Sequence, residues 1–92
     1  MGVHPVRSLF WYLAGAIAQA NKDYKRAITH FEHSIKLNPR NDTAWLSMGL
    51  VHGELGNWEQ SIQCCEKAIE LGLDRAEPWF LYGTALAKTK RH

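Results

Sequence analysis

The sequence predicts an all-α protein built from stacked pairs of antiparallel helices. Three tryptophans recur at a spacing of 34 residues, and a glycine follows four residues behind each of them: Trp11, Trp45 and Trp79, with Gly15, Gly49 and Gly83. A period of this length, kept by a rare residue and by glycine, is typical of stacked helical repeats. No stretch shows the two-residue alternation of a β-strand. We therefore expect about five helices, arranged as two and a half hairpins.

Size and composition limit the chain to one ordinary globular domain, residues 1–92. Its hydrophobic fraction of 46% and charged fraction of 22% are those of a soluble protein. Eleven Lys and Arg against nine Asp and Glu give a net charge of +2, which is too small to indicate a nucleic-acid partner. The basic run at residues 88–92 is interpreted as a solvated helix end rather than a binding patch.

Proline, asparagine and glycine divide the chain into the expected helices. Asn21 is expected to take a left-handed turn, and Pro39 to stop the second helix. Gly72 is predicted to cap the fourth helix, and the pair Asp74 and Glu77 to form a capping arrangement for the fifth. The expected helices run from residue 6 or 8 to 20, from 24 to 37, from 42 to 54 or 55, from 58 to 71, and from 75 to 88 or 90.

Cysteine and histidine are the residues that could carry chemistry. Cys64 and Cys65 are adjacent and would point about 100° apart on a helix, so they are interpreted as reduced thiols, with Cys65 packed as a small apolar residue. A redox or metal pair is the alternative. His30 and His33 have a spacing that metal ligands can use, but no matching carboxylate or cysteine completes a site. His52 is expected to be a packed, part-buried histidine. With no phosphate loop or nucleophile motif, we expect no enzyme activity, cofactor or metal.

The repeating pattern resembles the tetratricopeptide repeat. The residues that match the family pattern are Trp11, Gly15, Tyr24, Ala27, Phe31, Pro39, Trp45, Gly49, Gly56, Ala68, Trp79 and Gly83. Departures include Ala14, Ala18, Ser34, Met48, His52, Ser61, Cys65, Leu73, Tyr82 and Leu86. The resemblance implies a right-handed α-solenoid with two full repeats, at about residues 8–41 and 42–75, and the first helix of a third at residues 76–92.

Three glycines occupy the same position of the repeat inside predicted helices, and their presence there needs a physical reason. Each costs about 1 kcal/mol relative to alanine inside a helix. We expect Gly15, Gly49 and Gly83 to allow close approach of a neighbouring helix. Each tryptophan is expected to pack as a peg within its hairpin, because its ring buries a large apolar area.

The resemblance also implies a binding surface, since first helices of such arrays line a concave groove. The residues expected to line it here are Tyr12, Leu13, Ala16, Gln19, Leu46, Ser47, Leu50, Glu54, Glu77, Phe80, Leu81, Thr84 and Lys88. Its centre would be apolar, and a solvent-facing apolar groove indicates a protein or peptide partner. The function predicted is a non-catalytic protein–protein interaction module that binds an apolar or amphipathic segment.

One activity of the family, the binding of acidic chaperone tails, can be compared with the residues at the matching positions of this chain. Members that bind the acidic C-terminal tails of chaperones use Lys, Asn and Arg at five groove positions. This chain has different residues there: Tyr12, Ala16, Ser47, Glu77 and Leu81. The sequence therefore predicts no binding of acidic chaperone tails.

The fifth helix has no expected partner helix. Its face holding Tyr82, Ala85 and Leu86 would be uncovered, whereas terminal helices of solenoids usually present a polar outer face. Either the chain is a fragment of a longer array, or a second copy covers the face. The second explanation predicts self-association, and the alternative function is a structural module that forms homo-oligomers. We expect a cytoplasmic protein with no membrane span, because the apolar run near the N-terminus is too short to cross a bilayer. Export is the alternative, since residues 7–20 are similar to a signal peptide.

Overall fold

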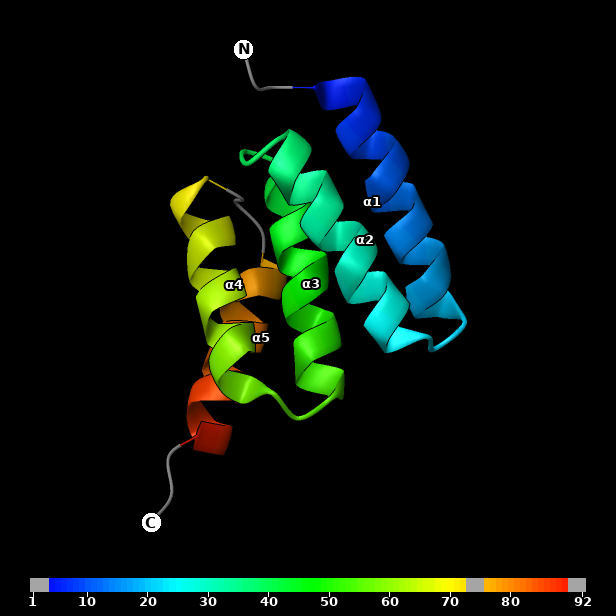
Figure 1. Ribbon diagram of the computed structural model, residues 1–92. Coiled ribbons are helices and arrows are strands. Elements are labelled where there is room, and N and C mark those ends of the chain that lie inside the picture. The colour runs from blue at the N-terminus through cyan, green and yellow to red at the C-terminus, as the bar shows by residue number, and fades with distance from the viewer. Residues whose placement is uncertain (1–3, 73–75, 90–92) are drawn as a thin grey trace.

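The computed structural model describes residues 4–72 and 76–89, with the backbone alone for Ala76 and Glu77. Five helices follow one another in the chain: α1 (Pro5–Ala20), α2 (Tyr24–Leu37), α3 (Asp42–Glu54), α4 (Trp58–Glu70) and α5 (Ala76–Thr89). The described residues contain no strand, so the prediction of an all-α fold is confirmed (Figure 1). Among these helices, none is both long enough and apolar enough to cross a lipid bilayer.

The helices begin and end at residues with a local physical reason. The side chain of Asp23 caps α2 by accepting from the backbone N–H of Arg26 at 3.4 Å. Asn41 caps α3 by accepting from the N–H of Ala44 at 3.2 Å. Gly72 follows α4 with φ +96°, as expected of a C-terminal glycine. The predicted capping pair of Asp74 and Glu77 lies outside the described residues.

The turn after α1 differs from the expectation. Asn21 has φ −87°, and the left-handed residue is Lys22, with φ 62°. The N–H of Lys22 donates to the carbonyl of Gln19, and that of Asp23 donates to the carbonyl of Ala18. These two bonds form a Schellman motif, which needs its left-handed residue directly after the C-cap. The motif therefore places a lysine in this conformation, and the prediction for Asn21 is wrong.

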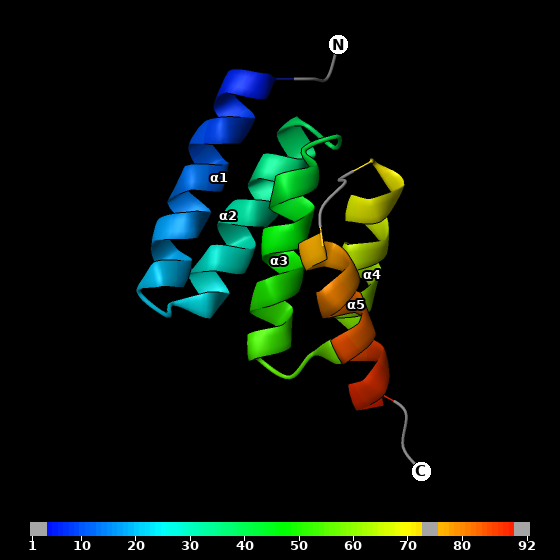
Figure 2. The same cartoon turned by 180° about the vertical axis from the view of Figure 1, so that it is seen from behind.

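The helices stack as consecutive antiparallel hairpins. α1 packs along α2, α3 along α4, and α3 also contacts α2, which joins the two hairpins. α5 packs along α4 at the end of the stack (Figures 1 and 2). The core is formed by side chains from the first four helices: Ala18, Ala27, Phe31, Met48, Val51 and Cys64.

Two glycines allow the close approach that the sequence predicts. A Cβ on Gly15 would lie 2.6 Å from the ring of Phe31, and one on Gly49 would lie 3.1 Å from the Cβ of Cys64. Gly83 is different, because a Cβ there would meet nothing within 4 Å. The expectation of close packing is therefore wrong at Gly83, since no helix of the described chain covers it. For the same reason Trp79 is 56% exposed rather than a buried peg.

A buried pair of serines ties the two ends of the first hairpin together. The hydroxyl of Ser8 donates to the carbonyl of Ser34 at 2.8 Å, and the hydroxyl of Ser34 donates to the carbonyl of Ser8 at 2.7 Å. The amide of Asn41 donates to the hydroxyl of Ser8 at 3.2 Å. Both serines are fully buried, so these bonds satisfy polar groups that water cannot reach.

The two cysteines are buried and free. Burial, with smaller contributions from the neighbouring Cys65 and Glu32, raises the pKa of Cys64 to about 12. Burial likewise raises the pKa of Cys65 to about 11, against a hydrogen bond with Ser61 that lowers it. Both thiols are therefore protonated at neutral pH, and the prediction that Cys65 packs as a small apolar residue is confirmed.

Alanine substitution of two glycines should give opposite results. Gly15→Ala should destabilise the protein by about 1–3 kcal/mol, because its methyl group would overlap the Phe31 ring. Gly83→Ala should leave the free energy of unfolding unchanged or raise it by up to about 1 kcal/mol, through helix propensity alone. Urea unfolding followed by circular dichroism measures both. Equal destabilisation by the two substitutions would contradict the close contact at Gly15.

The thiols should resist modification in the folded protein. A thiolate is the reactive form, and the raised pKa values of Cys64 and Cys65 keep its population low at mildly alkaline pH. Reaction with an aromatic disulfide reagent should therefore be much slower in the native protein than in urea, where both cysteines should react rapidly. Rapid native labelling of either cysteine would show that this region opens easily.

Candidate functional site

The predicted groove lies on the side of the stack formed by the first helices of the hairpins. α3 contacts both α1 and α5, so these three helices form a continuous layer (Figure 2). Each contributes an exposed apolar side chain: Leu13 is 51% exposed, Leu50 is 37% exposed and Phe80 is 78% exposed. Three large apolar groups in contact with water, one from each helix, make this layer a candidate interaction surface.

The predicted groove residues differ in how much of each side chain is exposed to solvent. The exposed ones are Leu13, Leu50, Glu54, Phe80 and Lys88. The half-buried ones are Tyr12, Ala16, Gln19, Ser47, Leu81 and Thr84. The side chain of Glu77 lies outside the described residues. Leu46 is 3% exposed, so the prediction that it faces solvent in the groove is wrong.

Several half-buried groove residues also serve the interior. The ring of Tyr12 packs on that of Phe31, with 5.7 Å between ring centroids. Leu81 packs toward Gly53, whose Cβ position would lie 3.7 Å from its Cδ1. Among the large apolar side chains of the predicted groove, Leu13, Leu50 and Phe80 are the exposed ones.

The histidines of α2 pack against a tryptophan. The ring of His33 stacks on that of Trp11 with centroids 4.5 Å apart, and the ring of His30 lies 5.4 Å from it. Within the described residues, no group of three or more His, Cys, Asp or Glu could hold a metal ion. His52 is half-buried, as predicted, and burial lowers its pKa while the carboxylate of Glu32 raises it. Packing thus accounts for where these rings lie.

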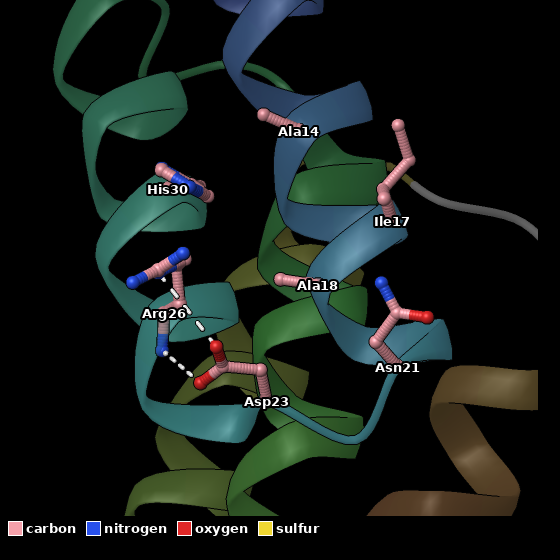
Figure 3. Close-up of a pocket in the computed structure, with 7 residues that line it drawn as sticks. All are labelled: Ala14, Ile17, Ala18, Asn21, Asp23, Arg26 and His30. Carbon is pink, nitrogen blue, oxygen red and sulfur yellow. Dashed lines mark hydrogen bonds and ion pairs between the residues drawn. The ribbon is translucent and has the colours of Figure 1, made fainter.

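A pocket of about 280 Å³ lies between α1 and α2 (Figure 3). Its polar wall is formed by Asp23 and Arg26, whose charged atoms lie 3.6 Å apart. The Asp23 carboxylate also caps α2. Ile17, which is 65% exposed, forms part of the apolar wall. The charged groups of this pocket are engaged in holding the turn and the helix start.

A second pocket, of about 260 Å³, lies between α4 and α5. It is lined by Glu66, Ile69, Glu70, Trp79 and Tyr82. The hydroxyl of Tyr82 donates to the carboxylate of Glu66 at 3.1 Å, and this bond raises the pKa of Tyr82. Sequence reasoning missed this site. The signal was the spacing of Glu66 and Glu70, which places two carboxylates on one face of α4.

The predicted self-association face is only partly exposed. Ala85 is fully buried, so it packs inside the protein and its assignment to that face is wrong. Tyr82 is half-buried and Leu86 is 36% exposed. The uncovered side of α5 instead holds Trp79, Gly83 and Leu86. The error follows from rotation along the helix, which turns residue 85 toward α4 and the interior.

The chain is similar to known proteins both in sequence and in fold. Stress-induced-phosphoprotein 1 of Caenorhabditis elegans is 30% identical over 74 residues, which cover 80% of this chain and 23% of that protein. This chain therefore spans less than a quarter of that relative's length. The solved N-terminal domain of stress-induced protein-1 from C. elegans has a TM-score of 0.85 and 26% identity, over 91% of this chain and 72% of that one.

A further solved structure is the first TPR of Spaghetti (RPAP3) bound to the HSP90 peptide SRMEEVD. It has a TM-score of 0.94 over 98% of this chain and 71% of that one, at 16% identity, which shows the shared fold. Family models described as tetratricopeptide repeat match residues 8–41 and residues 43–72. Together with the two stacked hairpins and the additional helix α5, these matches establish that the chain belongs to the tetratricopeptide repeat family.

Proposed function

We propose that the chain is a non-catalytic protein–protein interaction module that binds an apolar or amphipathic segment on the layer formed by α1, α3 and α5. The observation that carries this proposal is the exposure of Leu13, Leu50 and Phe80 on three adjacent helices. Relatives in the same repeat family support the general role of an interaction module. Burying these three side chains against a partner would remove a large apolar area from water.

A second candidate function is binding of an acidic peptide. It is favoured by the solved TPR of Spaghetti, which is bound to an HSP90 peptide that ends in EEVD. The residues of this chain argue against it, because Tyr12, Ala16, Ser47 and Leu81 offer no positive charge to a carboxylate. Among the predicted groove residues, Lys88 is the single cation, and Glu54 and Glu77 carry negative charges. We therefore favour an apolar ligand over an acidic tail.

A third candidate is assembly, in which the same apolar side chains form a homo-oligomer. It draws support from the exposed apolar residues on both terminal helices, such as Phe10 and Ile17 on α1 and Trp79 on α5. A cytoplasmic location, the absence of a nucleic-acid partner and the absence of a cofactor stay predictions from the sequence.

Peptide titration separates an apolar ligand from an acidic one. Isotope-labelled protein would be titrated with a Leu-rich amphipathic helical peptide and, in parallel, with the peptide SRMEEVD, following backbone amide signals by NMR. The amphipathic peptide should shift signals around Leu13, Leu50 and Phe80, whereas SRMEEVD should leave them unchanged. Low-micromolar binding of SRMEEVD would overturn the preference for apolar ligands.

Charged substitutions test the surface itself. The double variant Leu50→Glu/Phe80→Glu should weaken binding of the amphipathic peptide by at least about tenfold, because it places carboxylates in an apolar contact. Leu55→Glu is the matched control, since Leu55 is 44% exposed at the end of α3 and outside the proposed surface. Sedimentation would be run on each variant. Loss of an oligomer rather than of peptide binding would favour assembly instead.

A further inference from the structure

One ring nitrogen in the middle of the stack is closed off from solvent and has no hydrogen-bond partner among the described residues. It is Nδ1 of His52, on α3. His52 lies one turn after Met48, which belongs to the core, and one turn after Gly49, which packs against Cys64 of α4. Its Nδ1 edge is therefore turned toward the inside of the molecule, although the residue as a whole is half-buried.

This histidine lies on the helix that joins the two hairpins. α3 packs on α4 within its own hairpin and on α2 of the first hairpin (Figures 1 and 2). The negative charge of Glu32, on α2, acts on both the ring of His52 and the thiol of Cys64 on α4. Of the charged groups on the helices around it, Glu32 is the one that affects the pKa of His52. The ring therefore lies where α2, α3 and α4 meet.

The neutral ring suits this position and the protonated ring does not. A neutral imidazole carries its proton on one nitrogen and leaves the other as an acceptor, so Nδ1 can stay without a hydrogen. Protonation would place an N–H at Nδ1, where no group of the described chain accepts it, and would add a positive charge to a part-buried side chain. Burial accordingly lowers the pKa of His52, and the opposing effect of the Glu32 carboxylate is smaller.

We propose that His52 is an acid-sensitive switch at the junction of the two hairpins, and that its protonation loosens the packing of α3 on α2. The new N–H gains an acceptor when the ring turns out to water, and the ring then leaves its place between the helices. The other end of α3 stays tied, because the amide of Asn41 donates to the hydroxyls of Ser8 and Ser34 in the first hairpin. The junction therefore opens from the end that holds His52.

One other histidine nitrogen is buried without a partner in the described chain, but it lies elsewhere. It is Nδ1 of His30, on α2. The ring of His30 lies 5.4 Å from that of Trp11 and lines the pocket between α1 and α2, so it belongs to the first hairpin alone. Protonation of His30 would act on the contact of α1 with α2. The junction between the hairpins thus depends on His52.

Urea unfolding of the intact chain at two pH values tests the switch. An unfolded histidine has a pKa of about 6.5, and the folded chain holds the proton of His52 more weakly, so the unfolded state binds more protons as the pH falls. The stability that depends on neutral His52 is therefore complete above about pH 6.5 and is lost as the pH falls below it. The urea midpoint should drop between about pH 7.5 and about pH 5.5, and His52→Gln should remove part of that drop.

Three further variants identify the group responsible. His4→Gln is the matched control, because it replaces an exposed histidine before α1, and it should leave the drop in urea midpoint unchanged. Glu32→Gln should enlarge the drop, since it removes the charge that favours the protonated ring of His52. An unchanged drop in His52→Gln would overturn the proposal. If His30→Gln removed the drop instead, the switch would lie within the first hairpin and the proposal would be wrong.

Two NMR measurements on the unaltered chain keep the test decisive if His52→Gln folds poorly. In a titration of the histidine ring signals, His52 should change with a midpoint below about 6.5. Backbone hydrogen exchange, corrected for its intrinsic pH dependence, should show that acid removes more protection from the end of α3 near His52 than from the end near Asn41. A midpoint for His52 at or above that of a free histidine would overturn the proposal, as would an equal loss of protection at both ends of α3.

Discussion

Contact between the backbone of one helix and a side chain of its neighbour sets the spacing of the two helices within each hairpin. The ring of Phe31 lies against Gly15, and the Cβ of Cys64 lies against Gly49. Each contact brings the two helices of a hairpin close enough to exclude water from the seam. Because interiors are close-packed, a single added methyl group at such a contact has no free volume to occupy. The rest of the core is arranged around these two close contacts.

Much of the fold could be predicted because local signals agree with the repeat period. Gly72 follows α4 with a positive φ, as predicted, and Pro39 comes directly after the C-cap of α2. Lys22 was missed because a motif in the backbone, rather than side-chain preference, decides which residue takes the left-handed conformation. Local sequence signals thus predict helices and their ends better than they predict the conformation of a single turn residue.

The candidate site was less predictable, because exposure depends on neighbouring helices that a period does not describe. Leu46 and Leu50 both lie on α3, yet only Leu50 reaches solvent. Gly83 and Trp79 share the repeat positions of residues that are covered elsewhere, but no helix among the described residues packs over them. Two surfaces result, one apolar and one bordered by carboxylates. Units with the same fold can thus present chemically different faces.

The serine pair of the first hairpin limits how freely these repeats could be rearranged. The repeat period places the boundary between the units close to Asn41, whose amide donates to the hydroxyls of both Ser8 and Ser34. A unit cut from the array near this residue would lose a donor to two buried hydroxyls. A first unit moved into another protein would therefore keep both hydrogen bonds only if Asn41 were included in it. The last residue of the first repeat, Asn41, thus serves two units at once, because it holds the serine pair and also caps α3.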